Sequence, residues 1–321
     1  MNRSVILAAL LCGSAFAALA QNASLPLTLV VPYPPGGPLD TSAHLLARAA
    51  KPLLGDITVT NKPGAGGATG AALIAHAKSN ENMVVMGAVA THAVLPYLGS
   101  TVNYDAQKDF KPLILVARVP NVLVMKRSRA EQLGIKSTSD MVAYLKTHPG
   151  TLRLGSAGTG SIGHIAGEML KSLANLQLQS VPFAGAAPAQ KALLGGDVDI
   201  VFDNLASALP LINSGELMAL SVTTTDRNLA LPKVPSVNEE VPGFDVATWF
   251  GVFAPSTLPD KDAQKYAQAF QTALNDPQYK AQYQKMGIAP EDMRLQELSH
   301  FVKQESRKFQ FLINTIKIKA N

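Results

Sequence analysis

One stretch of 17 residues, LGSAGTGSIGHIAGEML at positions 154–170, constrains the fold of this chain more than any other. It reads as the end of a strand, then a loop of glycine and hydroxyl side chains, then the first turns of a helix. The first N–H groups of a helix have no carbonyl partner within it, and the helix dipole places partial positive charge at the same end. The stretch therefore predicts an anion cradle within an α/β fold.

The same succession of strand, glycine-rich loop and helix occurs near the start of the chain. Two short apolar runs are each followed by such a loop, and a third precedes Thr91 and His92. Repeated units of this kind are typical of an open parallel sheet covered by helices. We expect strands at 27–31, 57–60 and 83–87, loops at 32–38 and 61–67, and helices at 43–51, ended by Pro52, and at 68–78.

A second group of alternating helices and strands begins near position 139. The basic run at 126–129, which precedes it, is interpreted as a solvated loop. We expect strands at 152–155, 178–181, 198–202 and 218–222, helices at 139–146, 162–173, 187–194 and 205–213, an irregular segment at 231–242, and final helices at 260–274, 278–286 and 295–316.

Two long extended runs, at 113–125 and 244–254, separate these groups. Pro120 interrupts the first run, so we interpret it as a connector between domains rather than as a central strand. A mature chain of about 300 residues accommodates two domains. Because ligands of α/β sheets bind beyond the C-terminal ends of the strands, the cleft between the domains should hold the site, with the two crossings as hinges. The expected boundaries are 21–118 with 249–321 for the first lobe and 119–248 for the second.

The N-terminus has the pattern of an export signal. Arg3 precedes an apolar run at 5–19, and Ala18-Leu19-Ala20 forms an A-x-A cleavage site, so we expect residues 1–20 to be a signal peptide cleaved after Ala20. The only cysteine, Cys12, lies inside this segment, and Leu11 stands where a lipoprotein signal needs a small residue. We therefore predict an exported chain without a lipid anchor or disulfides.

Composition argues against a nucleic-acid partner. Without Arg3, the only charged residue of the first 20, Lys and Arg fall from 28 to 27 against 23 acidic residues, a net charge of +4. The basic residues are scattered and aromatic residues make up only 6% of the chain, so neither a phosphate-binding patch nor a base-stacking surface is expected. A weakly positive protein of this kind would attract small anions.

Enzyme and cofactor motifs are incomplete. The glycines at 158–163 match a dinucleotide fingerprint, but no acidic residue stands at 177–180, where the ribose would be held. The loop at 64–70 is not followed by the lysine of a phosphate loop. Thr159 replaces the first glycine of a nucleophile elbow around Ser161, and the histidines lack metal-ligand spacing, so we predict no cofactor and no metal.

Several polar residues admit two interpretations. His164 and His92 could each bond the local backbone or contact a ligand. Asp40 could be a first-turn acid of its helix, and Asp203 could cap the next helix or point at a ligand amine or hydroxyl. The glycine loops offer backbone N–H groups and hydroxyls but no arginine, and Lys62 is their only lysine. Donors without a nucleophile–base pair at motif spacing favour binding over catalysis.

Five segments together resemble the Bug family, the substrate-binding proteins of tripartite tricarboxylate transporters. They are VPYPPGGPLD (31–40), NKPGAGGATG (61–70), GSAGTGSIGHIAGEMLK (155–171), VPFAGAAPAQKALLGGDVDIVFDN (181–204) and WFGVFAP (249–255). The resemblance covers essentially the whole mature chain. It implies a periplasmic binding protein with the type II, two-lobed Venus flytrap fold. It also implies that the protein delivers a small carboxylate to membrane permease subunits. We expect a monomer that is not an enzyme.

The resemblance also implies a set of ligand-binding residues. Two positions depart from the family, because His44 and Ala184 stand where arginine and a polar or charged residue are often found. First-lobe contacts would be Tyr33, Gly36, Gly37 and Asp40, with Gly67, Ala68 and Thr91 nearby; second-lobe contacts would be Ser156, Gly158, Thr159, Gly160, Ser161, His164, Phe183, Ala184, Gly185, Asp203 and Asn204.

Two other functions stay open at this point. A binding protein of the same kind could dock on a membrane receptor kinase and act as a sensor. A secreted hydrolase would need Ser156 or Ser161 brought next to His164 or His92. The ligand itself could be a dicarboxylate, a tricarboxylate, an aromatic acid or an amino acid.

Overall fold

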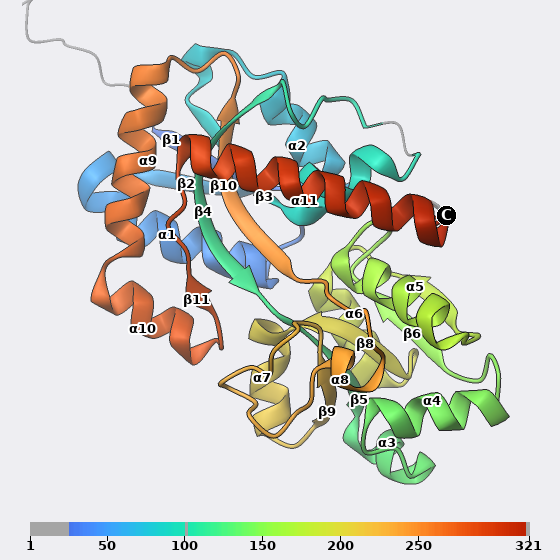
Figure 1. Cartoon of the computed structure of the whole chain (residues 1–321). Helices are drawn as coiled ribbons and strands as arrows, with labels where there is room; N and C mark the ends of the chain where they lie inside the picture. The colour runs from blue at the N-terminus through green and yellow to red at the C-terminus, as the bar shows by residue number, and fades with distance from the viewer. Residues whose placement is uncertain (1–25, 100–101, 319–321) are drawn as a thin grey trace, which may run out of the picture.

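A computed structural model of the chain describes residues 26–99 and 102–318, and the expected signal peptide with its cleavage site lies outside these residues. The chain forms two β-sheets, each flanked by helices (Figure 1). We call the six-stranded sheet with its helices the first lobe and the five-stranded sheet with its helices the second lobe. Within the described residues, no helix has both the length and the apolar character needed to cross a bilayer.

The first lobe has the strand order β11-β4-β10-β3-β1-β2. Its early strands are parallel, as the sequence predicted, but β10 runs antiparallel to both β3 and β4, so the sheet is mixed. The strands are β1 (Leu27–Val31), β2 (Ile57–Asn61), β3 (Met83–Ala88), β4 (Phe110–Val119), β10 (Thr248–Pro255) and β11 (Ala289–Pro290); the helices are α1 (Pro38–Leu54), α2 (Ala68–Ala75), α9 (Asp260–Leu274), α10 (Pro277–Lys285) and α11 (Leu295–Ile316).

The second lobe repeats this plan with the order β7-β6-β8-β5-β9. Strands β6, β7 and β8 are parallel, and β5 is antiparallel to β8 and β9. Its strands are β5 (Asn121–Lys126), β6 (Arg153–Ser156), β7 (Gln179–Pro182), β8 (Ile200–Asn204) and β9 (Leu217–Val222); its helices are α3 (Arg127–Leu133), α4 (Thr138–Thr147), α5 (Ile162–Ala174), α6 (Ala186–Gly195), α7 (Leu205–Asn213) and α8 (Val237–Glu240).

The first crossing differs from its prediction. The run at 113–125 does connect the two sheets, but it is not outside them: β4 and β5 are interior strands of the two sheets, and Pro120 lies alone between them. A proline at this junction costs no ladder hydrogen bond, because β4 has already ended and β5 has not yet begun. In the second crossing only Thr248–Pro255 is a strand, and its first residue pairs with Val119. The two crossings therefore run side by side.

Some local predictions are also wrong. Helix α1 begins at Pro38, where a missing N–H costs nothing, and Asp40 stands in its first turn as expected, but the helix does not end at Pro52. It continues past Pro52, since the last turn closes when Gly55 donates its N–H to the Lys51 carbonyl. The basic run at 126–129 starts helix α3, with the Arg127 side chain bonded to the Gly215 carbonyl. By contrast, β1, α7, α9 and α11 have the predicted bounds.

One buried apolar cluster extends through both lobes. It contains Val85 and Phe253 of the first sheet, Phe202 of the second, and Leu95 and Ile165 between them. Helix α11 contacts the first sheet and α5 of the second lobe, and Figure 1 shows it running across the first lobe toward α5. The lobes thus share a packed interface beside the site.

Candidate functional site

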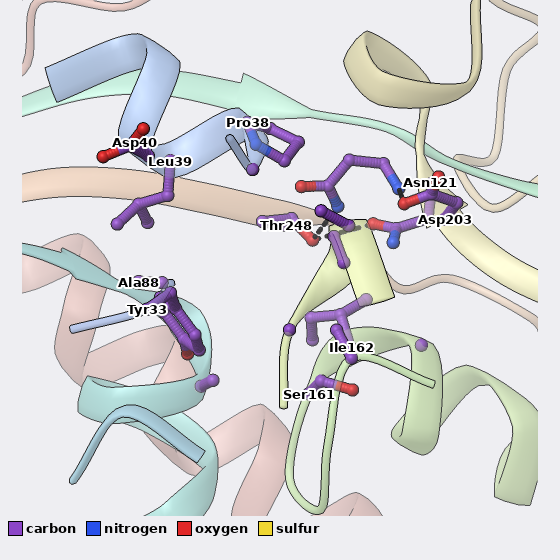
Figure 2. A pocket seen from close by; sticks show the side chains of 18 of the residues that line it. Tyr33, Pro38, Leu39, Asp40, Ala88, Asn121, Ser161, Ile162, Asp203 and Thr248 are labelled. Atoms are coloured by element: carbon purple, nitrogen blue, oxygen red, sulfur yellow. Dashed lines mark hydrogen bonds between the residues drawn. The ribbon is translucent and has the colours of Figure 1, made fainter. Parts of the chain in front are cut away.

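A cavity lies between the two lobes, next to the crossings. Figure 2 shows Tyr33, Leu39, Asp40 and Ala88 of the first lobe on one side, Asn121 and Asp203 on the other, and Ser161 and Ile162 below. The lining residues are Tyr33, Pro34, Gly37, Pro38, Leu39, Asp40, Ala88, Val89, Ala90, Asn121, Ala157, Ser161, Ile162, Gly163, Gly185, Ala186, Ala187, Pro188, Phe202, Asp203, Asn204, Thr248 and Phe250.

Three helices begin at this cavity. The lining includes residues 37–40 at the start of α1, 161–163 at the start of α5 and 185–188 at the start of α6. The first N–H groups of each helix have no intrahelical acceptor, and the three dipoles present their positive ends here. Among the residues that the structure describes, no lysine, arginine or histidine lines the cavity. The donors that this cavity offers to an anion are therefore backbone N–H groups rather than basic side chains.

Glycine at the α6 N-cap lets the lobes approach each other. Gly185 has a φ of 143°, and a Cβ atom there would lie 3.2 Å from Cδ of Pro34 across the cleft. A side chain at this position would strain the backbone and press on the facing loop. The cavity is thus bounded where the α6 start meets the loop after β1.

Hydrogen bonds to the Asp40 side chain hold the loop that follows β1. The Asp40 carboxylate accepts the Gly36 N–H at 2.9 Å and the Asn61 side-chain amide at 2.8 Å. The same amide donates to the Tyr33 carbonyl at 3.0 Å. Asp40 thus serves its helix and loop in the way a first-turn acid does, while also lining the cavity.

Asp203, the penultimate residue of β8, lies on the opposite wall and is 5% exposed. Its carboxyl group accepts the Asn204 N–H at 2.8 Å and the Gln190 side-chain amide at 3.1 Å. Burial raises the pKa of Asp203 to about 6, against the opposing effect of hydrogen bonds from Ser207, Asn204 and Gln190. This group therefore changes charge near neutral pH.

A chain of polar contacts joins the two crossings at the cavity wall. The Thr248 hydroxyl donates to the Asn121 side-chain carbonyl at 2.7 Å and accepts the Asn204 amide at 3.2 Å. Sequence reasoning missed Asn121 and Thr248. The sequence does place one polar residue in each crossing. That pattern predicts a shared position at the cavity only once the crossings are known to lie side by side as paired strands.

The sequence-predicted site residues divide into two groups. Those that line the cavity are Tyr33, Gly37, Asp40, Ser161, Gly185, Asp203 and Asn204. Those that lie outside its lining are Gly36, Gly67, Ala68, Thr91, Ser156, Gly158, Thr159, Gly160, His164, Phe183 and Ala184. Sequence reasoning also missed the apolar wall, to which Leu39, Ile162, Phe202 and Phe250 contribute.

The glycine loop before α5 packs against the first lobe. A Cβ atom on Gly160 would lie 2.6 Å from Cδ2 of Leu95, and one on Gly66 would lie 2.8 Å from the Thr159 carbonyl oxygen. The sequence pattern of this loop was read as a cradle, and the structure shows that part of its glycine content permits close contact between lobes.

His164 bonds its own loop. The Gly160 N–H donates to Nδ1 of His164 at 3.2 Å, and the Ser161 hydroxyl caps the helix by accepting the His164 N–H at 3.2 Å. Burial lowers the pKa of His164. The Ser161 hydroxyl is thus bonded to the backbone of His164 rather than to its ring, which is not the geometry of an activated nucleophile.

His92 is enclosed in the aromatic core. Its ring stacks on Phe253 at 3.8 Å between centroids, and Nδ1 lies 2.8 Å from the Thr91 hydroxyl. Burial lowers the pKa of His92 to about 3, so the ring is neutral. Within 26–99 and 102–318, no three His, Cys, Asp or Glu side chains gather in a cluster able to hold a metal ion.

Comparison with known proteins places this arrangement in a family. The family model described as the tripartite tricarboxylate transporter family receptor, TctC, matches residues 43–318. The structure of the periplasmic binding protein BugD has a TM-score of 0.86 and 29% identity, covering 92% of this chain and 98% of BugD.

Two similar structures contain organic acids. Rpa4515 of R. palustris with adipate has a TM-score of 0.85 and 29% identity, covering 92% of this chain and 98% of its own. MatC from Rhodopseudomonas palustris with bound malate has a TM-score of 0.84 and 29% identity, covering 90% and 98%. The predicted resemblance and the two-lobed fold are thereby confirmed. The chain belongs to the tripartite tricarboxylate transporter receptor family, whose members are periplasmic solute-binding proteins.

Proposed function

We propose that this protein captures a small organic acid in the cavity between its lobes and delivers it to the permease subunits of a tripartite tricarboxylate transporter. One observation carries the proposal: three helix N-termini meet at a cavity that no basic side chain lines. A helix N-terminus stabilises an anion by about 1 kcal/mol, and by up to about 2 kcal/mol when partly buried. The three termini together offer an anion several backbone donors without a basic side chain.

The rest of the cavity suits the body of such an acid. Leu39, Phe202 and Phe250 offer apolar contacts, while Asn121 and Thr248 offer hydrogen bonds. Adipate and malate, the acids named for the two similar structures, differ in length and polarity. The identity of the acid therefore does not transfer to this chain, and we propose the class of small carboxylates.

Capture would use the two lobes as a clamp. We propose the division into 21–118 with 249–321 and 119–248, with Pro120 and the start of β10 as hinges. The contacts of Pro34 with Gly185 and of Gly66 with Thr159 bring the lobes together beside the cavity. The free energy of closure would come from an acid touching both lobes at once. We infer a role in the periplasm after cleavage of residues 1–20, and a role in binding rather than catalysis.

Charge reversal at the start of α6 tests the proposal. Ala186 lines the cavity in the first turn of α6. We expect Ala186→Asp to lower the affinity for an organic acid at least a hundredfold, because a fixed carboxylate would occupy the backbone donors. An acidic residue in the first turn does not destabilise a helix, so the melting temperature of Ala186→Asp should equal that of the wild type.

Ala186→Asn is the control, with the same shape and no charge. It should lose no more than about tenfold in affinity, a cost of about 1.4 kcal/mol. Calorimetry would be done with the acid that most raises the melting temperature in a panel of dicarboxylates, tricarboxylates, aromatic acids and amino acids. Equal affinity of the Asp and Asn variants would contradict the proposed site.

A further inference from the structure

The cavity contains acidic groups but no basic ones. Its ionisable lining residues are Tyr33, Asp40 and Asp203. Burial raises the pKa of Tyr33, so its hydroxyl stays neutral, and that hydroxyl donates to the Gly66 carbonyl at 3.0 Å. An entering carboxylate thus meets two carboxyl groups and no compensating side chain. The affinity of the cavity for an anion therefore depends on whether these carboxyl groups are ionised.

Asp40 has donors of its own in the first lobe. The Gly36 N–H and the Asn61 amide both donate to its carboxylate, and Nε2 of His44 lies 3.7 Å away. Both carboxyl oxygens of Asp40 therefore have hydrogen-bond donors from the first lobe itself.

Asp203 has only neutral neighbours. Its two oxygens accept from the Asn204 N–H and from the Gln190 amide, and the Ser207 hydroxyl is a third neutral partner. The Gln190 amide is fixed by a second bond to the Ser207 carbonyl at 3.0 Å. A carboxyl group has about four lone pairs, so at least one remains to carry a proton.

No charged side chain contacts Asp203 from the elements packed around it. On α6, Lys191 is exposed to solvent. Helix α7 has no ionisable residue. On the paired strand β5, Lys126 lies at the far end, where it donates to the Leu194 carbonyl.

The ionisable residues of α5 and β6, which also pack on β8, have partners elsewhere. On α5, the His164 ring accepts the Gly160 N–H, and Lys171 donates to Glu168. On β6, Arg153 donates to the Gly196 carbonyl and pairs with Asp199. Asp40 is the acidic residue on the facing wall.

We propose that Asp203 takes up one proton from solvent when an organic anion enters the cavity, so that a neutral carboxyl group faces the bound acid. The proposal rests on the proposed function and adds a regulation to it: capture strengthens as pH falls. Two negative charges in one water-poor site repel strongly, and protonation of one carboxyl group removes that repulsion. A protonated carboxyl group also becomes a hydrogen-bond donor.

The pH window follows from linkage. Burial already raises the pKa of free Asp203 to about 6, and a bound anion raises it further. Above about pH 6 the affinity should fall by up to tenfold per pH unit, until the pKa of Asp203 in the complex is passed. Below about pH 6 the affinity should level off, because Asp203 is then protonated in both states.

Calorimetry with adipate and malate, at about pH 6 and about pH 8 and in buffers of different ionisation enthalpy, tests the inference. The wild type should bind at least tenfold more weakly at the higher pH and take up close to one proton per acid near pH 7. Asp203→Asn should bind equally at both pH values, take up no proton, and bind more tightly than the wild type at the higher pH. Asp197→Asn, an exposed acid of the same lobe, should retain the wild-type pH dependence.

The outcomes separate the inference from the proposed function. Binding that is independent of pH and without proton uptake overturns the inference and leaves the function standing. No binding of any acid in the panel at either pH contradicts both. A measurement without ligand adds a check: in carbon-13 NMR of aspartate-labelled protein, the resonance missing from Asp203→Asn should titrate near pH 6. Titration near the ordinary aspartate value of about 4 would overturn the inference.

Discussion

In this protein, the type of a residue and its place in the sequence do not by themselves determine the role of its side chain. His164 and Asp203 both stood beside glycine or a helix start in the sequence, and each had two interpretations. In the structure, the His164 ring accepts a hydrogen bond from the backbone of its own loop, whereas Asp203 lies on the cavity wall. Burial and hydrogen-bond partners decide between such interpretations, and both depend on distant segments that one-dimensional spacing does not contain.

Buried His92 should make the stability of the fold sensitive to acid. The unfolded chain binds a proton at His92 below about pH 6.5, whereas the folded chain binds it only near pH 3. Stability is therefore lost as pH falls through this window. Relative to the wild type, we expect the free energy of unfolding of His92→Phe to increase by about 2–3 kcal/mol, that is, the variant to become relatively more stable, as pH falls from about 6.5 to about 4.5.

Urea unfolding at several pH values measures this difference. The phenylalanine ring would retain the stacking on Phe253 and lose the contact with Thr91. His148→Phe, at an exposed histidine that stacks on Tyr144, controls for the substitution itself. A difference between His92→Phe and the wild type that stays constant with pH would show that His92 is not buried in the neutral form.

At the scale of elements, the sequence predicted the strand, loop and helix at 152–173 within one or two residues. Local signals suffice there, because Ser161 caps the helix and apolar residues recur at helical spacing. The loop has a second role that no local signal carries: Gly160 faces Leu95 of η5 (Leu95–Tyr97) in the other lobe. Glycine patterns therefore predicted where a helix begins but not what its loop contacts.

A paired substitution separates backbone strain from lobe packing. Gly160 and Gly196 have φ of 78° and 84°, but only at Gly160 would a Cβ atom meet a neighbour, Leu95. We expect both alanine variants to lose about 1 kcal/mol of unfolding free energy from strain. Gly160→Ala should lose a further 1–3 kcal/mol, roughly, by overpacking, and should also bind organic acids more weakly. Equal losses at the two sites, by urea unfolding and calorimetry, would contradict a lobe-packing role.

For the whole molecule, the sequence predicted two lobes and two crossings but not how the crossings are built. Both became strands, paired to each other, and their polar residues Asn121 and Thr248 reached the cavity. Helix α11 was predicted with its observed bounds, but not its position. Glu305 accepts the indole N–H of Trp249 at 3.1 Å, and Lys308 pairs with Asp245 at 3.1 Å, so this helix also holds the second crossing. Such contacts join residues about 60 positions apart, so no periodic pattern in the sequence predicts them.

The position of a bound acid tests the central claim most directly. A crystal structure of the protein with the acid that most raises its melting temperature should show the acid between the lobes. We predict a carboxylate about 3 Å from backbone N–H groups at the starts of α5 and α6, touching no lysine or arginine. An acid held by basic side chains, for example in the groove lined by Lys126, Arg129 and Arg153, would contradict the account.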